Sequence, residues 1–106
     1  MVVGAGAEFE GLLSLRRPGR IEGEVKGDVI AAASLWIGPG GCVRGRVEAD
    51  EVIVDGRLEG EVHARGRIEL RRGARVRADL SAPRLILADG SFFEGQCQAG
   101  SPGSEG

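Results

Sequence analysis

Hydrophobic and polar residues alternate along this chain in short stretches that recur at a nearly fixed interval. The pattern apolar-x-small-x-apolar-x-apolar begins at residues 9, 25, 43, 58, 76 and 93, at spacings of 16, 18, 15, 18 and 17 residues. A second alternating piece follows in most repeats, as in Leu35-x-Ile37, Val52-x-Val54, Ile68-x-Leu70 and Leu85-x-Leu87. A period of two is typical of strands. The connections are too short to contain a helix, which excludes βαβ units.

Short strands that repeat about every 17 residues predict an all-β chain wound into a β-solenoid of about six coils. Parallel strands of successive coils would lie ~4.8 Å apart. One inward column of stacked side chains is then expected to contain Leu13, Val29, Val47, Val62, Leu80 and Cys97. Glycine or alanine falls at the tight corners, where the backbone bends sharply. Two outward columns support this register, because most charged neighbours in them have opposite signs: Lys26, Arg44, Glu59, Arg77 and Glu94, and beside them Asp28, Arg46, Glu61, Asp79 and Gln96.

Composition narrows the functional classes. The chain has 106 residues and a formal net charge of −2, which disfavours nucleic-acid binding. The longest nearly apolar run, residues 29–37, is about half of what a membrane-spanning helix needs. The two cysteines are too few for a disulfide scaffold, and a single histidine argues against a three-histidine metal site. We therefore predict no catalytic residue, no bound metal and no cofactor.

The chain resembles the bactofilins, a family of bacterial polymer-forming cytoskeletal proteins. The resemblance is carried by Ile21-Glu22-Gly23-Glu24-Val25-Lys26-Gly27-Asp28-Val29-Ile30-Ala31, by its echo over residues 54–64, and by the closing Gly90-Ser91-Phe92-Phe93-Glu94-Gly95. It covers roughly residues 3–99 and implies a right-handed, three-faced parallel β-helix. We accordingly predict a β-helix polymerisation domain over residues 1–99 and a short flexible tail over residues 100–106.

The resemblance also implies non-polar filaments that form without nucleotide, in which like ends of the subunits meet. An aromatic residue of the last coil is important for that contact, which indicates Phe93 or its neighbour Phe92. We expect the C-terminal contact to comprise Phe92, Phe93, Leu85 and Leu87, and the N-terminal contact to comprise Val3, Phe9 and Leu13. Polymerisation has a physical reason, since an uncapped terminal coil exposes unpaired backbone groups and the end of its apolar columns.

Trp36, Ile53 and Ile86 share a predicted outward column with Glu69, so three large apolar side chains occupy one exposed face. Such a group indicates a lateral contact, either between protofilaments or with a membrane or partner protein, or else scattered surface apolarity. Many family members bind membrane through a disordered N-terminal tail. Here the first coil is expected to begin almost at Met1, which leaves little room for one.

The leading hypothesis is a cytoskeletal scaffold that positions other proteins in the bacterial cytoplasm. A location on the inner face of the cytoplasmic membrane is part of the same hypothesis. Cell-wall and chromosome-segregation proteins are partners across the family. The alternative is a hexapeptide-repeat acyltransferase on a left-handed β-helix, although irregular spacings and the lack of an inserted loop argue against it. An ice-binding solenoid usually presents rows of threonine, and this chain has no threonine.

Overall fold

The computed structural model describes residues 2–99, and over this range the chain consists of strands, turns and bends without a helix. Met1 and residues 100–106 lie outside the described residues, so the predicted tail and the boundary at residue 99 stay predictions. The strands, in chain order, are β1 (Val2–Val3), β2 (Glu8–Leu15), β3 (Gly19–Ile21), β4 (Glu24–Ala31), β5 (Ser34–Ile37), β6 (Cys42–Val54), β7 (Arg57–Leu70), β8 (Arg75–Ala82), β9 (Arg84–Leu87), β10 (Phe92–Glu94) and β11 (Cys97–Ala99).

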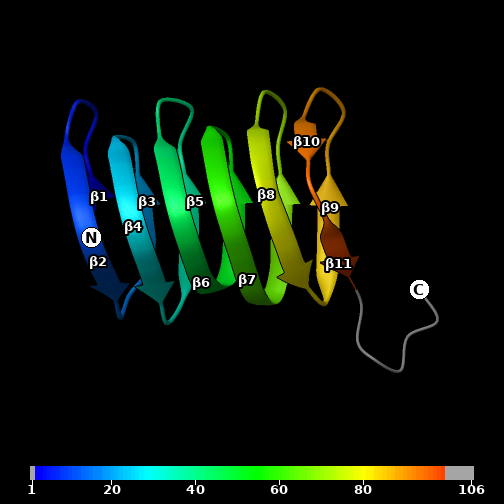
Figure 1. Ribbon diagram of the computed structural model, residues 1–106, viewed down its shortest axis with the longest axis horizontal. Coiled ribbons are helices and arrows are strands. Elements are labelled where there is room, and N and C mark those ends of the chain that lie inside the picture. Colours follow the sequence, from blue (N-terminus) through cyan, green and yellow to red (C-terminus); the bar gives the residue numbers. More distant parts are fainter. Residues whose placement is uncertain (1, 100–106) are drawn as a thin grey trace.

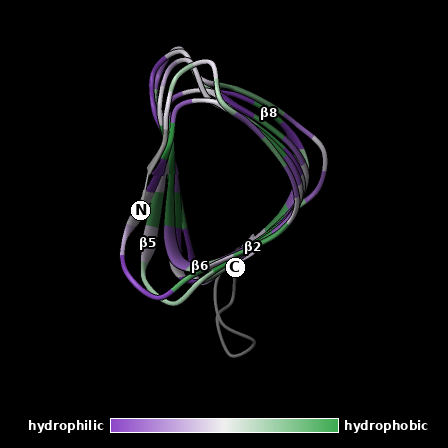
Figure 2. Cartoon of the chain, turned by 90° about the vertical axis from the view of Figure 1, so that its left-hand side faces the viewer, coloured by the Kyte–Doolittle hydropathy of each residue, from purple (hydrophilic) through white to green (hydrophobic). Residues whose placement is uncertain are grey.

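The strands wind into a right-handed parallel β-solenoid. In Figure 1 the nearer strands run downward while the coils advance from left to right, which is a right-handed path. Every strand pair is parallel and joins one coil to the next, for example β2 to β4 and β4 to β6. The end view in Figure 2 shows a roughly triangular outline with three sides. The predicted fold class is therefore confirmed.

The number of coils is slightly lower than expected. The column of strand partners whose backbone begins at Val3 continues through Ile21, Ile37, Val54, Leu70 and Leu87, so six stacked positions are separated by about five complete turns. The sequence repeat counts stacked positions, whereas the solenoid is measured by the turns between them. We call the stacked positions of one column rungs, numbered 1 to 6 from the N-terminal end.

The three faces are the three sides of each turn. Face 1 carries the rungs at residues 8–10, 24–26, 42–44, 57–59, 75–77 and 92–94, and face 2 follows it after a sharp bend in the same strands. Face 3 carries β1, β3, β5 and β9 together with the ends of β6 and β7. The pairing shifts by one position between Ala49 and Glu51, at the corner from face 2 to face 3, where coils of unequal length are accommodated.

The core is a narrow stack of aliphatic side chains. The predicted column from Leu13 to Cys97 forms in the expected order. Among the described residues, every buried side chain is apolar. Complete burial of a valine, leucine or isoleucine side chain contributes roughly 1.5–3 kcal/mol. Stacked aliphatic columns therefore replace the large aromatic core that this composition does not supply.

Glycine makes the bend between face 1 and face 2. Gly27, Gly45 and Gly60 stack on one another with φ between 122° and 137°, a region that residues with a Cβ rarely adopt. A Cβ built on Gly45 would lie 1.9 Å from the carbonyl oxygen of Gly27. At these three rungs the backbone conformation leaves no room for a Cβ, whereas rung 5 has Ala78 at the same corner without a positive φ.

Candidate self-association surfaces

Over the described residues, the C-terminal end of the solenoid is open. Within residues 2–99, β9 pairs with β7, and β10 and β11 pair with β8, so each of these last strands has a neighbour on one side. Their outer backbone N–H and C=O groups face away from the stack. Such an edge is a template for pairing with another strand.

Apolar side chains at the ends of the inward columns are exposed at the same surface. Leu87 is 52% exposed because its inward column has no seventh rung within residues 2–99, and Leu85 and Phe93 are half-buried against the core. Cys97 ends the column of Leu80 and is also exposed. Of the predicted C-terminal contact residues, Leu85, Leu87 and Phe93 thus lie together on the end of the stack.

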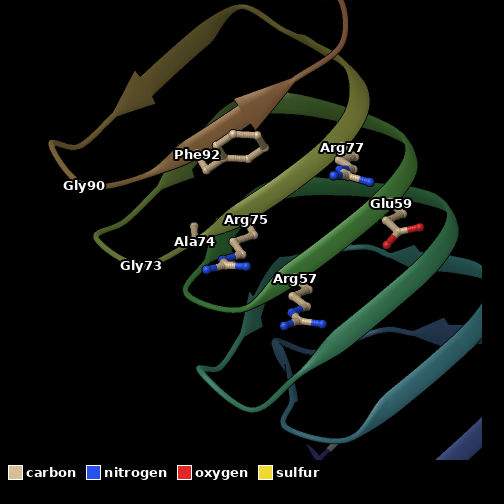
Figure 3. A pocket seen from close by; sticks show the side chains of 8 residues that line it. All are labelled: Arg57, Glu59, Gly73, Ala74, Arg75, Arg77, Gly90 and Phe92. Carbon is tan, nitrogen blue, oxygen red and sulfur yellow. The ribbon is translucent and has the colours of Figure 1, made fainter.

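Phe92 and Phe93 point in opposite directions, as neighbours in a strand do. Phe93 stacks on Val76 in an inward column, whereas Phe92 stacks on Arg75 in an outward one. Figure 3 shows Phe92 on the side of the solenoid, in line with Arg75 and Arg57 on the preceding strands. The structure therefore separates two residues between which the sequence analysis did not choose: Phe93 ends an inward column at the end surface, and Phe92 points outward from face 1.

The N-terminal end is formed by β1 and β2, which pair with β3 and β4 on one side. Phe9 is half-buried, but Leu13 is only 5% exposed, so it contributes little open surface. The backbone of Val3 pairs with Ile21, while the side chain of Val3 lies outside the described ones. Among the described side chains, the two ends are therefore unequal, and the C-terminal end exposes more apolar surface.

Trp36, Ile53 and Ile86 share one column on face 3, as predicted, with Glu69 between the two isoleucines. Trp36 already has partners within the chain. Its Nε1 donates a hydrogen bond to Asp55 Oδ2, and the Arg20 guanidinium lies 4.3 Å from the ring centroid. Ile86 is exposed, whereas Trp36 and Ile53 are half-buried. The apolar group is consequently smaller and more divided than the sequence suggests.

The outward charge columns stack as predicted. Arg44 and Glu59 lie 4.0 Å apart, Arg46 and Glu61 3.3 Å, and Arg77 and Glu94 3.2 Å. Exposed pairs of this kind contribute about 0.2–1 kcal/mol each. They support the register of the coils more than they stabilise the fold.

Sequence reasoning missed the outermost column of face 1, which contains Glu8, Glu24, Cys42, Arg57, Arg75 and Phe92. Beside its C-terminal half lies a hollow of about 620 Å³, lined by Arg57, Glu59, Gly73, Ala74, Arg75, Arg77, Gly90 and Phe92 (Figure 3). The signal was present, because each of these column residues precedes a first core position by one. The hollow itself depends on how the corner turns project, which the repeat does not encode.

No clustered chemistry accompanies these surfaces in the part of the chain that the structure describes. Over residues 2–99, three or more His, Cys, Asp or Glu side chains do not come together where they could hold a metal ion. The same range includes no helix able to cross a membrane. His63 lies on face 2 between Glu48 and Ser81, where these residues line a hollow of about 290 Å³.

Comparison with known proteins identifies one family. Residues 1–98 match the family model described as "Bactofilin: Polymer-forming cytoskeletal". Bactofilin BacO of Myxococcus xanthus is 34% identical over 94 residues, which cover 89% of this chain and 75% of BacO. Bactofilin BacP of the same organism is 32% identical over 99 residues, which cover 93% of this chain and 41% of BacP. The search of solved structures found no match.

The matched region includes all six face 1 rungs and the open end at Phe93. The repeat, the right-handed solenoid and the family match thus agree over nearly the whole chain, which belongs to the bactofilin family of polymer-forming cytoskeletal proteins.

Proposed function

We propose that this chain self-assembles end to end, without nucleotide, into non-polar filaments that position other proteins in the bacterial cytoplasm. The observation that supports this best is the last turn, where open strand edges surround Leu85, Leu87 and Phe93. A second subunit stacked there extends the backbone ladder and covers the ends of the apolar columns. Both gains act together, because hydrogen bonds and burial form over the same surface.

Contact between like ends is part of the proposal. A two-fold contact at the C-terminal end would bring Leu87 and Phe93 of one subunit against the same surface of the next, and an isologous contact of this kind closes on itself. The second contact, through Val3, Phe9 and Leu13, then propagates the filament. Because Leu13 is already buried within one chain, backbone pairing along β1 and β2 would supply more of that contact than apolar burial does.

Nucleotide independence is supported by local chemistry. The glycine-rich turn Gly38-Pro39-Gly40-Gly41 connects β5 to β6, so no helix follows it to direct backbone N–H groups at a phosphate. The proposed clients are cell-wall or chromosome-segregation proteins, and a location on the inner face of the cytoplasmic membrane belongs to the same proposal.

Purified protein imaged by negative-stain microscopy at neutral pH tests this function. We expect filaments that form equally well with and without added nucleotide, because no step of the contact uses one. A uniform population of trimers in solution would contradict the proposal and would favour the acyltransferase alternative.

A lateral contact through Trp36, Ile53 and Ile86 is a separate part of the proposal. Replacing Trp36 by glutamate should leave filaments intact and weaken bundling or vesicle binding on the order of tenfold, as removal of a central aromatic anchor does. Sedimentation of filaments at low speed, and with vesicles, measures both. Ile30→Glu is the matched control, since Ile30 is an exposed apolar residue on face 2. Equal sedimentation of the two variants would exclude face 3 as the contact.

A further inference from the structure

Face 1 carries a segregated row of charges along the solenoid axis. In its outermost column Glu8 and Glu24 occupy rungs 1 and 2, Cys42 occupies rung 3, and Arg57 and Arg75 occupy rungs 4 and 5. Like charges stacked on neighbouring strands repel each other. One end of the column is therefore acidic and the other basic, with a free thiol between them.

These charges are not balanced within the chain. Among the ion pairs that the described residues form, none includes Glu8, Glu24, Arg57 or Arg75. In the next column of the same face, Arg44 pairs with Glu59 and Arg77 with Glu94. The outermost column thus has unpaired acidic residues in one half and unpaired basic residues in the other. Both are accessible to a binding partner.

The basic half is hollowed. Arg57, Arg75 and Arg77 line the hollow of about 620 Å³ together with Glu59 and Phe92 (Figure 3). Three arginines and one glutamate make its charged lining basic. Acidic side chains that project from another surface would fill this space and neutralise it.

A second copy of this chain supplies such a surface in one arrangement. In this arrangement two copies face each other through face 1, with their solenoid axes antiparallel. They are related by a two-fold axis that runs along the strand direction beside rung 3. Rung 1 of one copy then meets rung 5 of the other, and rung 2 meets rung 4. Glu8 then lies opposite Arg75, and Glu24 opposite Arg57. The neighbouring column agrees independently, since Glu10 lies opposite Arg77 and Lys26 opposite Glu59.

The registers one rung away are less favourable, because each keeps some opposite pairs, such as Glu24 with Arg75 or Glu8 with Arg57, but adds like ones. Sliding the partner by one rung in one direction places Glu10 opposite Glu94 and Lys26 opposite Arg77. Sliding it by one rung in the other direction places Glu10 opposite Glu59 and Lys26 opposite Arg44. Each shift therefore brings like charges together in both places. In the favourable register, Arg44 opposite its own copy is the one like pair, and each Arg44 already has Glu59 beside it.

We propose that face 1 is a lateral self-association surface, on which a second copy packs antiparallel with Cys42 opposite Cys42. This contact uses the side of the solenoid and is separate from the end contact that forms filaments. It gives the side of the polymer a specific partner and register, because charge complementarity across an interface selects orientation.

Cross-linking through Cys42 tests the arrangement. The background is Cys97→Ser with Phe93→Arg, which removes the other cysteine and the end contact. Facing sheets pack about 10 Å apart, which is too far for a direct disulfide, so a short bismaleimide is the reagent. We expect covalent dimers at low salt and their loss at ~1 M salt, where the screening length falls to about 3 Å.

Charge reversal provides the specific readout. Glu24→Arg and Arg57→Glu should each lower the dimer yield on the order of tenfold, because the two-fold axis makes each change create two like pairs. The combined variant should restore it. Glu48→Arg on face 2 is the matched control and should leave the yield unchanged. Circular dichroism shows whether each variant folds. If Glu24→Arg or Arg57→Glu does not fold, the pair Glu8→Arg and Arg75→Glu is used for the same test.

The proposal is overturned by folded protein that gives no Cys42 dimer at low salt, by single reversals that keep the full yield, or by a combined variant that does not recover. If the combined variant does not recover and the folded protein instead binds inorganic phosphate in calorimetry, with binding lost in Arg75→Glu, the basic hollow binds a free anion and not a second copy. Should Phe93→Arg still polymerise, the end contact is refuted while the Cys42 result stands, because Cys42 lies on the side face.

Discussion

Replacing Phe93 by arginine should abolish filaments and leave a folded subunit. Phe93 ends an inward column and is half-buried against the core, so in a single chain the longer arginine can extend its guanidinium past the last rung into water. In a filament the same charge would be enclosed in an apolar contact without a partner, which costs several kcal/mol. Negative-stain microscopy and size-exclusion chromatography measure the loss, and circular dichroism measures the fold.

Phe92→Arg is the matched control, with the same change in the neighbouring residue of the same strand. Phe92 points to the side of the solenoid, where arginine already occupies the two preceding rungs. We expect filaments of normal length from this variant. Normal filaments from Phe93→Arg, or equal loss from both variants, would refute an end contact that depends on the inward column.

Gly45→Ala should destabilise the solenoid by about 4 kcal/mol or more, a large effect for a single methyl group. The added Cβ meets the Gly27 carbonyl oxygen at 1.9 Å, and the φ of 137° is itself unfavourable for alanine. Since Gly27 is held by its own strand pairing on both sides, neither backbone can move away cheaply. Urea unfolding in the Phe93→Arg background, where polymerisation does not contribute to stability, gives the value.

Gly73→Ala separates the two causes. Gly73 also has a positive φ, of 88°, but a Cβ there would meet nothing within 4 Å. We expect a loss of only about 1–2 kcal/mol, the cost of the left-handed conformation alone. Equal losses at Gly45 and Gly73 would show that the stacked corner tolerates the methyl group and that φ alone determines the effect.

The repeat allowed most of the fold to be predicted from the sequence. An alternation of period two, found at near-equal spacing, specifies both which side chains point inward and which of them stack, so the column from Leu13 to Cys97 needed no further information. The triangular outline and the right-handedness of the solenoid were predicted from the family resemblance, because the hydrophobic pattern does not determine the geometry of the corners.

The surfaces were harder to predict, for reasons that differ between them. The repeat aligned residue 93 with residue 76, but the end contact was still assigned to either Phe92 or Phe93 until the register of β10 on β8 was known. The indole of Trp36 is engaged by Asp55 and Arg20, contacts that depend on side-chain conformations in adjacent coils. The near-complete burial of Leu13 at the first rung depends on packing at the N-terminal end, which the repeat does not predict.

The even spacing of strand partners has a consequence for how stability is distributed. Each strand pairs with strands 15 to 18 residues away, so cooperativity passes only between neighbouring coils, as in a one-dimensional chain. Opening an outer coil breaks one interface, whereas opening a central coil breaks two. An isolated subunit should therefore fray from its extremities inward, and attachment of another subunit turns an outer coil into a central one, which stops the fraying at that end.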